Sequence, residues 1–144
     1  MTKRPNEATT CAWISLMRTQ RLALSRVEAR LKEAKLPPLS WYDVLWELEK
    51  AGDQGLRPYE LEKALLFAQY NLSRLAERLA AAGLIDRHEC SHDRRGQVLK
   101  ITARGRALRR DTWAVYAQAI EDAVGARLST EEAETLAVLL KKLQ

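Results

Sequence analysis

The chain has 144 residues, of which 47% are hydrophobic and 30% charged, and its formal net charge is +5. This balance is that of an ordinary globular domain large enough to bury a hydrophobic core. No apolar run approaches the roughly 20 residues of a membrane span, and the first residues lack the apolar stretch of a signal peptide. We therefore expect one cytoplasmic domain that does not enter a membrane.

The positive charge is concentrated in the middle of the sequence. Between Arg57 and Arg110 there are twelve basic and six acidic residues, a net charge of +6, whereas the rest of the chain carries −1. A local excess of positive charge is typical of a surface that binds a polyanion. A solvated basic face without a partner would have the same composition, so both interpretations stay open at this point.

Residues that could carry chemistry are few. Cys11 and Cys90 form no C-x-x-C pair, so we expect free thiols rather than a disulfide. His88, Cys90 and His92 suggest a metal site, but the two histidines would lie on the order of 13 Å apart along a strand, and a further ligand would be needed. We find no Ser/His/Asp set, acidic pair or phosphate-binding glycine loop. The sequence therefore predicts neither an enzyme nor a resident metal or cofactor.

Helical periodicity extends over most of the chain, because apolar residues recur at steps of three and four. Pro37-Pro38 ends the first helix, and Gly83 suits the C-terminal cap of the fourth. Ser40 is expected to cap the second helix with Asp43 in the capping-box position, and Ser129 to begin a capping box for the last. The predicted helices are residues 9–35, 41–51, 58–65, 68–82, 103–128 and the segment after Ser129.

The period changes after Gly83. Residues 84–90 and 97–102 have the length of strands and are separated by a polar turn, which predicts a β-hairpin. In the second strand Leu99 and Ile101 are expected on one face, and Val98, Lys100 and Thr102 on the other. Helices followed by a strand, a basic turn and a strand are the layout of a winged helix-turn-helix. The predicted fold class is therefore mainly α with a small β-hairpin wing.

Two runs of the sequence closely resemble the MarR family of transcriptional regulators. The run from Leu72 to Arg87 contains R-L-x-x-R-L-x-x-x-G-L-I-x-R, and the run from Asp93 to Gly105 reads D-R-R-G-Q-V-L-K-I-T-A-R-G. The segment from Leu39 to Leu45 also fits. The sequence departs from the family at residues 67–70, where Phe-Ala-Gln-Tyr stands in place of the more usual Leu-Ser-x-Ser. The resemblance covers almost the whole chain.

The resemblance implies a homodimeric, sequence-specific regulator that binds a palindromic operator in double-stranded DNA. It further implies a repressor released by a small aromatic or phenolic effector, within one domain of residues 1–144. The terminal helices, residues 9–36 and 112–144, would dimerise, because their apolar stripes are too long for one winged module, and residues 39–110 would bind DNA. The alternatives are terminal helices that pack within a monomer, and a constitutive or redox-responsive regulator that uses Cys11.

For DNA binding, the fourth helix would enter the major groove, where Gln and Asn can bond adenine and Arg can bond guanine. By analogy with the family, Arg95 at the wing tip would enter the minor groove, braced by Asp93, while Arg94 meets phosphate. The alternative is a polar surface that faces solvent. The candidate DNA-binding residues are Gln69, Tyr70, Asn71, Ser73, Arg74, Asp93, Arg94 and Arg95.

The second predicted helix is apolar on two sides, which is typical of a helix packed between layers or lining a cavity. The MarR resemblance implies a small-molecule pocket between the dimer helices and the DNA-binding lobe. Aromatic residues that simply belong to the core are the alternative. The candidate effector-binding residues are Trp13, Arg21, Trp41 and Trp46.

Overall fold

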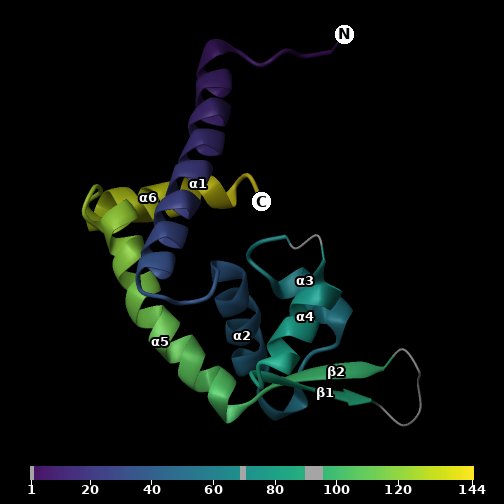
Figure 1. Cartoon of the computed structure of the whole chain (residues 1–144). Helices are drawn as coiled ribbons and strands as arrows, with labels where there is room; N and C mark the ends of the chain where they lie inside the picture. Colours follow the sequence, from purple (N-terminus) through teal and green to yellow (C-terminus); the bar gives the residue numbers. More distant parts are fainter. Residues whose placement is uncertain (1, 69–70, 90–95) are drawn as a thin grey trace. The chain divides into compact units, whose positions relative to one another are not determined.

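The computed structural model describes residues 2–68, 71–89 and 96–144. Over these residues it confirms a mainly α fold with one two-stranded antiparallel hairpin (Figure 1). None of the described helices is long and apolar enough to cross a membrane. In chain order the elements are α1 (Glu7–Glu33), α2 (Leu39–Ala51), the 3-10 turn η1 (Gly52–Gln54), α3 (Pro58–Ala64), α4 (Leu72–Ala81), β1 (Ile85–Glu89), β2 (Gln97–Ile101), α5 (Ala103–Ile120), the π-helical turn η2 (Glu121–Gly125) and α6 (Thr130–Lys141).

The chain divides into two compact units. The first comprises Met1–Arg30 and Tyr116–Gln144, and the second comprises Leu31–Val115. The second unit therefore contains α2, α3, α4 and the hairpin, whereas the first contains most of α1 and all of α6.

One hydrophobic core holds the second unit together. Val44, Leu45 and Leu48 of α2 lie at its centre and are 0–1% exposed. Leu61 of α3 and Leu79 of α4 are fully buried in the same cluster. Figure 1 shows α3 and α4 beside α2, with the hairpin against them. The apolar faces of α3, α4 and the hairpin thus pack on one shared core, which fixes these elements relative to one another.

The hairpin pairs as the alternation predicts. Ile85 lies opposite Ile101 and Arg87 opposite Leu99, and Leu99 and Ile101 of β2 are buried. A further contact was not predicted. Leu56, just before α3, forms an isolated antiparallel bridge with Leu99, with N···O distances of 2.9 and 2.8 Å. This bridge occupies the second hydrogen-bonding edge of β2 and ties the start of α3 to the hairpin.

The structure corrects the predicted start of α2. The helix begins at Leu39, directly after Pro38, so the predicted cap Ser40 lies inside the first turn. Pro38 is the N-cap, and its ψ of 154° is still extended, so the first helical residue is Leu39. Asp43 is then too far along the helix to close a capping box. The predicted cap of α4 is confirmed, because Gly83 has φ +75° and follows the last helical turn.

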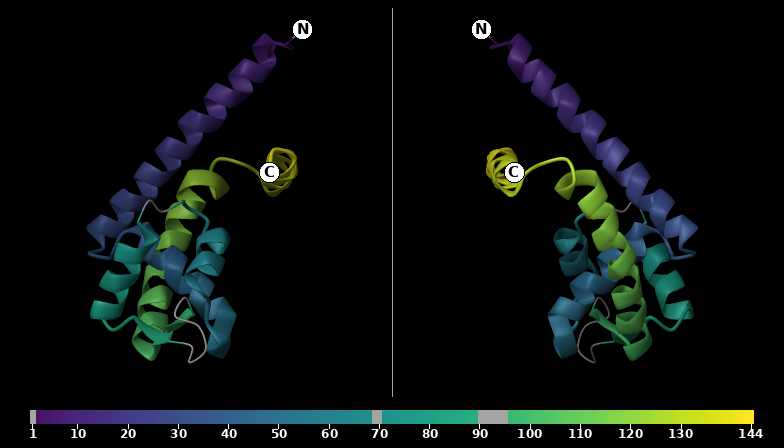
Figure 2. Two further views of the ribbon diagram at one scale, coloured as in Figure 1. Left: turned by 90° about the vertical axis from the view of Figure 1, so that its right-hand side faces the viewer. Right: turned by 90° about the vertical axis from the view of Figure 1, so that its left-hand side faces the viewer.

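In the first unit, the predicted capping box of α6 is confirmed. Ser129 Oγ accepts a hydrogen bond from the Glu132 N–H at 3.1 Å, and Glu132 Oε1 accepts one from the Ser129 N–H at 3.0 Å. The single helix predicted over residues 103–128 is wrong beyond Ile120, where η2 widens the backbone into a π-helical turn. Arg30 of α1 pairs with Asp122 in this turn. Figure 2 shows α1 as one uninterrupted helix.

Candidate nucleic-acid interface

The predicted DNA-reading helix, α4, begins at Leu72 and not four residues earlier as the sequence suggested. Asn71 is its N-cap, because Asn71 Oδ1 accepts a hydrogen bond from the Arg74 backbone N–H at 3.1 Å. An Asn at this position satisfies one of the free amides at the helix start. The oxygen of Asn71 is therefore used within the protein. The predicted contacts Gln69 and Tyr70 lie outside the described residues.

One face of α4 is buried and the other is accessible. Leu75, Ala76 and Leu79 pack into the core. Ser73 and Arg74 are exposed in the first turn of the helix, where the sequence predicts DNA contacts. The first turn of α4 therefore exposes the Ser73 hydroxyl and the Arg74 guanidinium, while the opposite face of the helix packs on the core.

The tip of the hairpin lies outside the described residues, which end at Glu89 and resume at Gly96. The predicted wing contacts Asp93, Arg94 and Arg95 fall in this gap, as do Cys90 and His92. Among the residues that the structure describes, no three His, Cys, Asp or Glu side chains are grouped to hold a metal ion.

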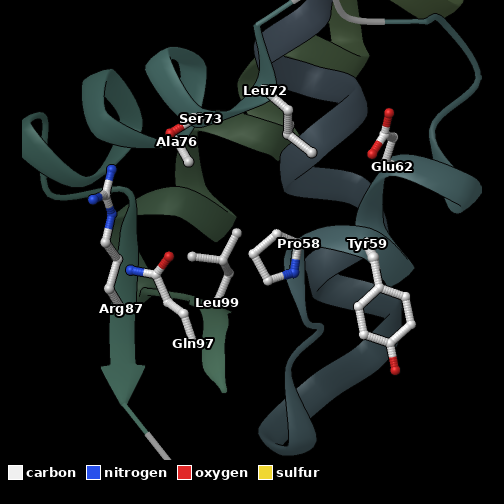
Figure 3. A pocket seen from close by; sticks show the side chains of 9 residues that line it. All are labelled: Pro58, Tyr59, Glu62, Leu72, Ser73, Ala76, Arg87, Gln97 and Leu99. Atoms are coloured by element: carbon white, nitrogen blue, oxygen red, sulfur yellow. The ribbon is translucent and has the colours of Figure 1, made fainter. Parts of the chain in front are cut away.

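A pocket of about 360 Å³ opens between α3, α4 and the hairpin. In Figure 3, Pro58 and Leu99 point toward one another at its centre, and Arg87 extends from β1 toward α4. Ser73 and Ala76 line the α4 side. Its volume lies within the roughly 300–1,000 Å³ of small-ligand pockets. The sequence did not predict this pocket, whose other lining residues are Tyr59, Glu62, Leu72 and Gln97.

Asp43 is a buried acid of α2, and its side chain is only 5% exposed. Its Oδ1 accepts a hydrogen bond from the Leu66 N–H at 3.1 Å, and its Oδ2 accepts one from the Phe67 N–H at 2.9 Å. Burial raises the pKa of Asp43 above its ordinary value of 3.8, and the two backbone hydrogen bonds oppose this rise only in part. The carboxylate thus joins α2 to the connection between α3 and α4.

The raised pKa of Asp43 predicts how stability depends on pH. Folding takes up a proton between the unfolded pKa of 3.8 and the higher folded value. The contribution of Asp43 to the free energy of unfolding is therefore largest below 3.8 and is lost as pH rises through the folded pKa. We expect the free energy of unfolding of the wild type, minus that of Asp43→Asn, to fall across this window in urea titrations. A difference that rises with pH would contradict the assignment.

The second apolar side of α2 faces α5 within the second unit. Tyr42 stacks on Trp113, with ring centroids 6.0 Å apart. The Arg109 guanidinium lies 5.1 Å from the Trp46 ring, and Arg109 Nε lies 2.7 Å from Glu49 Oε2, although its N–H is not aligned as a hydrogen bond. The two-sided pattern therefore reflects a helix packed between the core and α5.

The four predicted effector residues divide between the units. Trp41 is half-buried against the core and Trp46 is partly exposed beside Arg109, both in the second unit. Trp13, at 63% exposed, and Arg21 lie on α1 in the first unit, as does the exposed Cys11. The residues that sequence reasoning missed are Arg87 and Tyr59 of the pocket, Arg109, and Asp43 in its observed role.

Comparison with known proteins supports one family throughout. The sequence profile described as the MarR family matches residues 34–96. The multiple antibiotic resistance protein MarR of Salmonella typhimurium is 31% identical over 118 residues, which cover 79% of this chain and 81% of that protein. MarR of Escherichia coli is 31% identical over 88 residues, 61% of either chain. The aligned region thus spans less than two thirds of the E. coli protein.

Solved structures show the same fold. Sco3205, a MarR family transcriptional regulator from Streptomyces coelicolor in complex with DNA, superposes with a TM-score of 0.87 at 24% identity, over 99% of this chain and 89% of that one. BpsR of Bordetella bronchiseptica, whose DNA binding is regulated by 6-hydroxynicotinic acid, superposes with a TM-score of 0.80 at 22% identity, over 98% and 97%. The chain therefore belongs to the MarR family of transcriptional regulators and has its winged helix-turn-helix fold.

Proposed function

We propose that the protein is a homodimeric repressor that binds a palindromic operator in double-stranded DNA. The observation that carries this proposal is the first turn of α4, which exposes Ser73 and Arg74 beside a hairpin in the most basic part of the chain. Two neighbouring structures of the family hold DNA, which supports the same partner here. The test is a mobility shift with the DNA upstream of the protein's own gene.

Each part of this surface has a distinct task in the proposal. The first turn of α4 enters the major groove, where Arg74 bonds a guanine edge and Ser73 a phosphate. Asn71 keeps its oxygen on the helix cap and offers its amide hydrogens, and Gln69 and Tyr70 extend the contacts. At the wing tip Arg95 enters the minor groove, braced by Asp93, and Arg94 contacts a phosphate.

Replacing Arg74 should reduce specific binding more than non-specific binding. We expect Arg74→Ala to lower affinity for the operator about ten- to a hundredfold, because a bidentate contact to guanine is lost. Affinity for random DNA should change far less, and fluorescence anisotropy with both duplexes measures the ratio. Arg4→Ala removes an exposed arginine that lies outside the proposed dimerising and DNA-binding segments, and is the matched control. Equal losses of affinity for operator and random DNA would show that Arg74 does not contact a base.

The partner in the proposed dimer is a second copy of the chain. In the first unit a groove of about 470 Å³ runs between α1 and α6, and its lining is mostly apolar side chains. Trp13 and Leu143, which line it, are 63% and 71% exposed. A cluster of this kind on one chain usually marks an interface, and two-fold dimers are the commonest assembly. Under this proposal residues 9–36 and 112–144 dimerise and residues 39–110 bind DNA.

The proposed effector is a small aromatic acid, and the pocket between α3, α4 and the hairpin fits it best. Arg87 makes no ion pair with any described residue and extends into this pocket, while Pro58 and Leu99 offer an apolar surface. Because Ser73 lines the same pocket, an occupant would lie beside the DNA-reading turn. The predicted effector-binding set Trp13, Arg21, Trp41 and Trp46 stays the alternative location of the effector, and oxidation of the exposed Cys11 stays the alternative signal.

Ligand binding in the absence of DNA tests the pocket. We expect 6-hydroxynicotinate or 2-hydroxybenzoate to raise the melting temperature of the wild type, and Arg87→Ala to abolish this shift because the carboxylate loses its cation. Arg78→Ala removes an exposed arginine of α4 that does not line the pocket, and should keep the shift. A shift that survives Arg87→Ala but disappears in Trp46→Ala would place the effector beside α2 instead.

A further inference from the structure

Asp43 holds a segment that neither α3 nor α4 contains. α3 ends at Ala64 and α4 begins at Leu72, and the two amides in question, at residues 66 and 67, lie just after α3. Both donate to one carboxylate, which comes from α2 more than twenty residues earlier in the sequence. The start of the connection, at Leu66 and Phe67, is therefore held by a tertiary contact.

Asp43 lies on a helix that is packed into the core. Asp43 is followed on α2 by Val44 and Leu45, which are 0% and 1% exposed at the centre of the core. A side chain attached to a helix so deeply packed cannot follow the connection if the connection moves. The two hydrogen bonds thus hold Leu66 and Phe67 at a fixed place relative to the core.

Burying a carboxylate to accept hydrogen bonds from two amides costs free energy of desolvation. No Lys, Arg or His forms an ion pair with Asp43 in the part of the chain that the structure describes. Desolvation penalises the charged form and raises the pKa of Asp43 despite both hydrogen bonds. Because burying an unpaired charge contributes little net stability, the value of this contact lies in the geometry that it imposes.

We propose that Asp43 is a positioning residue for DNA recognition, which holds the α3–α4 connection so that the first turn of α4 meets the DNA in one fixed place. Only a few residues separate Phe67 from Asn71, the cap of α4, and from Arg74. Contacts to base edges tolerate displacements of only about 0.5 Å, so a loosened connection would weaken them. This inference rests on the proposed DNA-binding function.

The test compares two single-charge changes on α2. Asp43→Asn keeps the shape of the side chain but turns one acceptor oxygen into an NH2 group, which cannot accept from a backbone N–H. Glu47→Gln removes a charge from the same helix, where Glu47 pairs only with the neighbouring Lys50 among the described residues, and is the matched control. Operator and random-DNA affinities are measured well below the melting temperature of each variant.

We expect Asp43→Asn to lose about tenfold in operator affinity while random-DNA affinity stays within about twofold, since phosphate contacts tolerate displacement better than base contacts do. Glu47→Gln should change neither affinity. A folded Asp43→Asn protein with wild-type operator affinity would overturn the inference. Wild-type protein that binds no upstream DNA would instead refute the proposed function.

Amide hydrogen exchange keeps the inference testable if Asp43→Asn fails to fold. In the wild type, the amides of Leu66 and Phe67 should exchange much more slowly than unprotected amides of the same sequence. In Asp43→Glu, whose longer side chain carries the carboxylate to a different place, both should exchange faster and operator affinity should fall together with them. Unprotected amides at Leu66 and Phe67 in the wild type would overturn the inference directly.

Discussion

A Leu139→Glu variant should be monomeric at micromolar concentration and should lose about a hundredfold or more in operator affinity, because a dimer engages its second half-site at a high effective concentration. Leu139 lines the apolar groove of the first unit and is 52% exposed on a single chain. In the proposed dimer it is covered by the partner, where a carboxylate would have to be desolvated without a counter-charge. Analytical ultracentrifugation gives the assembly state and anisotropy gives the affinity.

The neighbouring residue supplies the control for this variant. Val138 is 62% exposed on the same helix but does not line the groove. Val138→Glu therefore introduces the same charge and also replaces an exposed apolar side chain. We expect it to remain dimeric and to bind the operator as the wild type does. A dimeric Leu139→Glu protein would exclude the groove as the interface, and a monomeric Val138→Glu protein would show that the interface reaches beyond it.

Local patterns in the sequence are enough to find most elements of this fold. Leu75 and Leu79 are four residues apart and both are buried, so the helical period gives the body of α4 and its inner face. Leu99 and Ile101 alternate with more exposed residues, so the strand period gives β2. These predictions succeed because one buried face leaves the same spacing in the sequence wherever the element lies.

Helix starts were less predictable, because one residue type serves several roles. Ser40 and Asp43 have the spacing of a capping box, but Pro38 starts α2 earlier and frees the Asp43 carboxylate for another partner. Asn71 sits in a run that looks helical, yet its side chain caps the helix from outside. Short polar side chains compete for nearby amides, and tertiary packing decides which amide each one reaches.

The candidate site depends on contacts that no local pattern contains. The bond from Asp43 to Phe67 spans 24 residues, and the bridge from Leu56 to Leu99 joins segments even further apart. Arg87 was visible only as part of the MarR-like run, and its place beside α4 follows from the hairpin register. The sequence therefore predicts α4, the helix proposed to read DNA, but not the contacts that position it.

Gly105→Ala should destabilise the protein by about 3 kcal/mol, near the upper end of what an added methylene in a packed core costs. Gly105 is in the first turn of α5, where its N–H donates to Thr102 Oγ1 at 3.0 Å. A Cβ at this position would lie 2.2 Å from the Leu84 carbonyl oxygen and 2.8 Å from Ile101 Cγ1. The urea midpoint of unfolding measures the loss.

Neither neighbour of Gly105 can move away easily. Leu84 and Ile101 are 3% and 6% exposed in the core, and the same Leu84 carbonyl accepts the Thr102 N–H at 3.1 Å. The Thr102 hydroxyl also donates to the Gly83 carbonyl at 2.7 Å, so the turn after α4 is attached to the start of α5. Relieving the clash would therefore separate α5 from the end of α4.

Gly125→Ala provides the matched substitution in a helical glycine. Its Cβ would meet only the Glu121 carboxylate, the exposed end of a flexible side chain that can rotate away. Since alanine stabilises a helix by roughly 0.5–1 kcal/mol relative to glycine, this variant should be as stable as the wild type or more so. A Gly105→Ala protein as stable as Gly125→Ala would contradict the close approach of α5 to the Leu84 carbonyl, and with it the attachment of α5 to the end of α4.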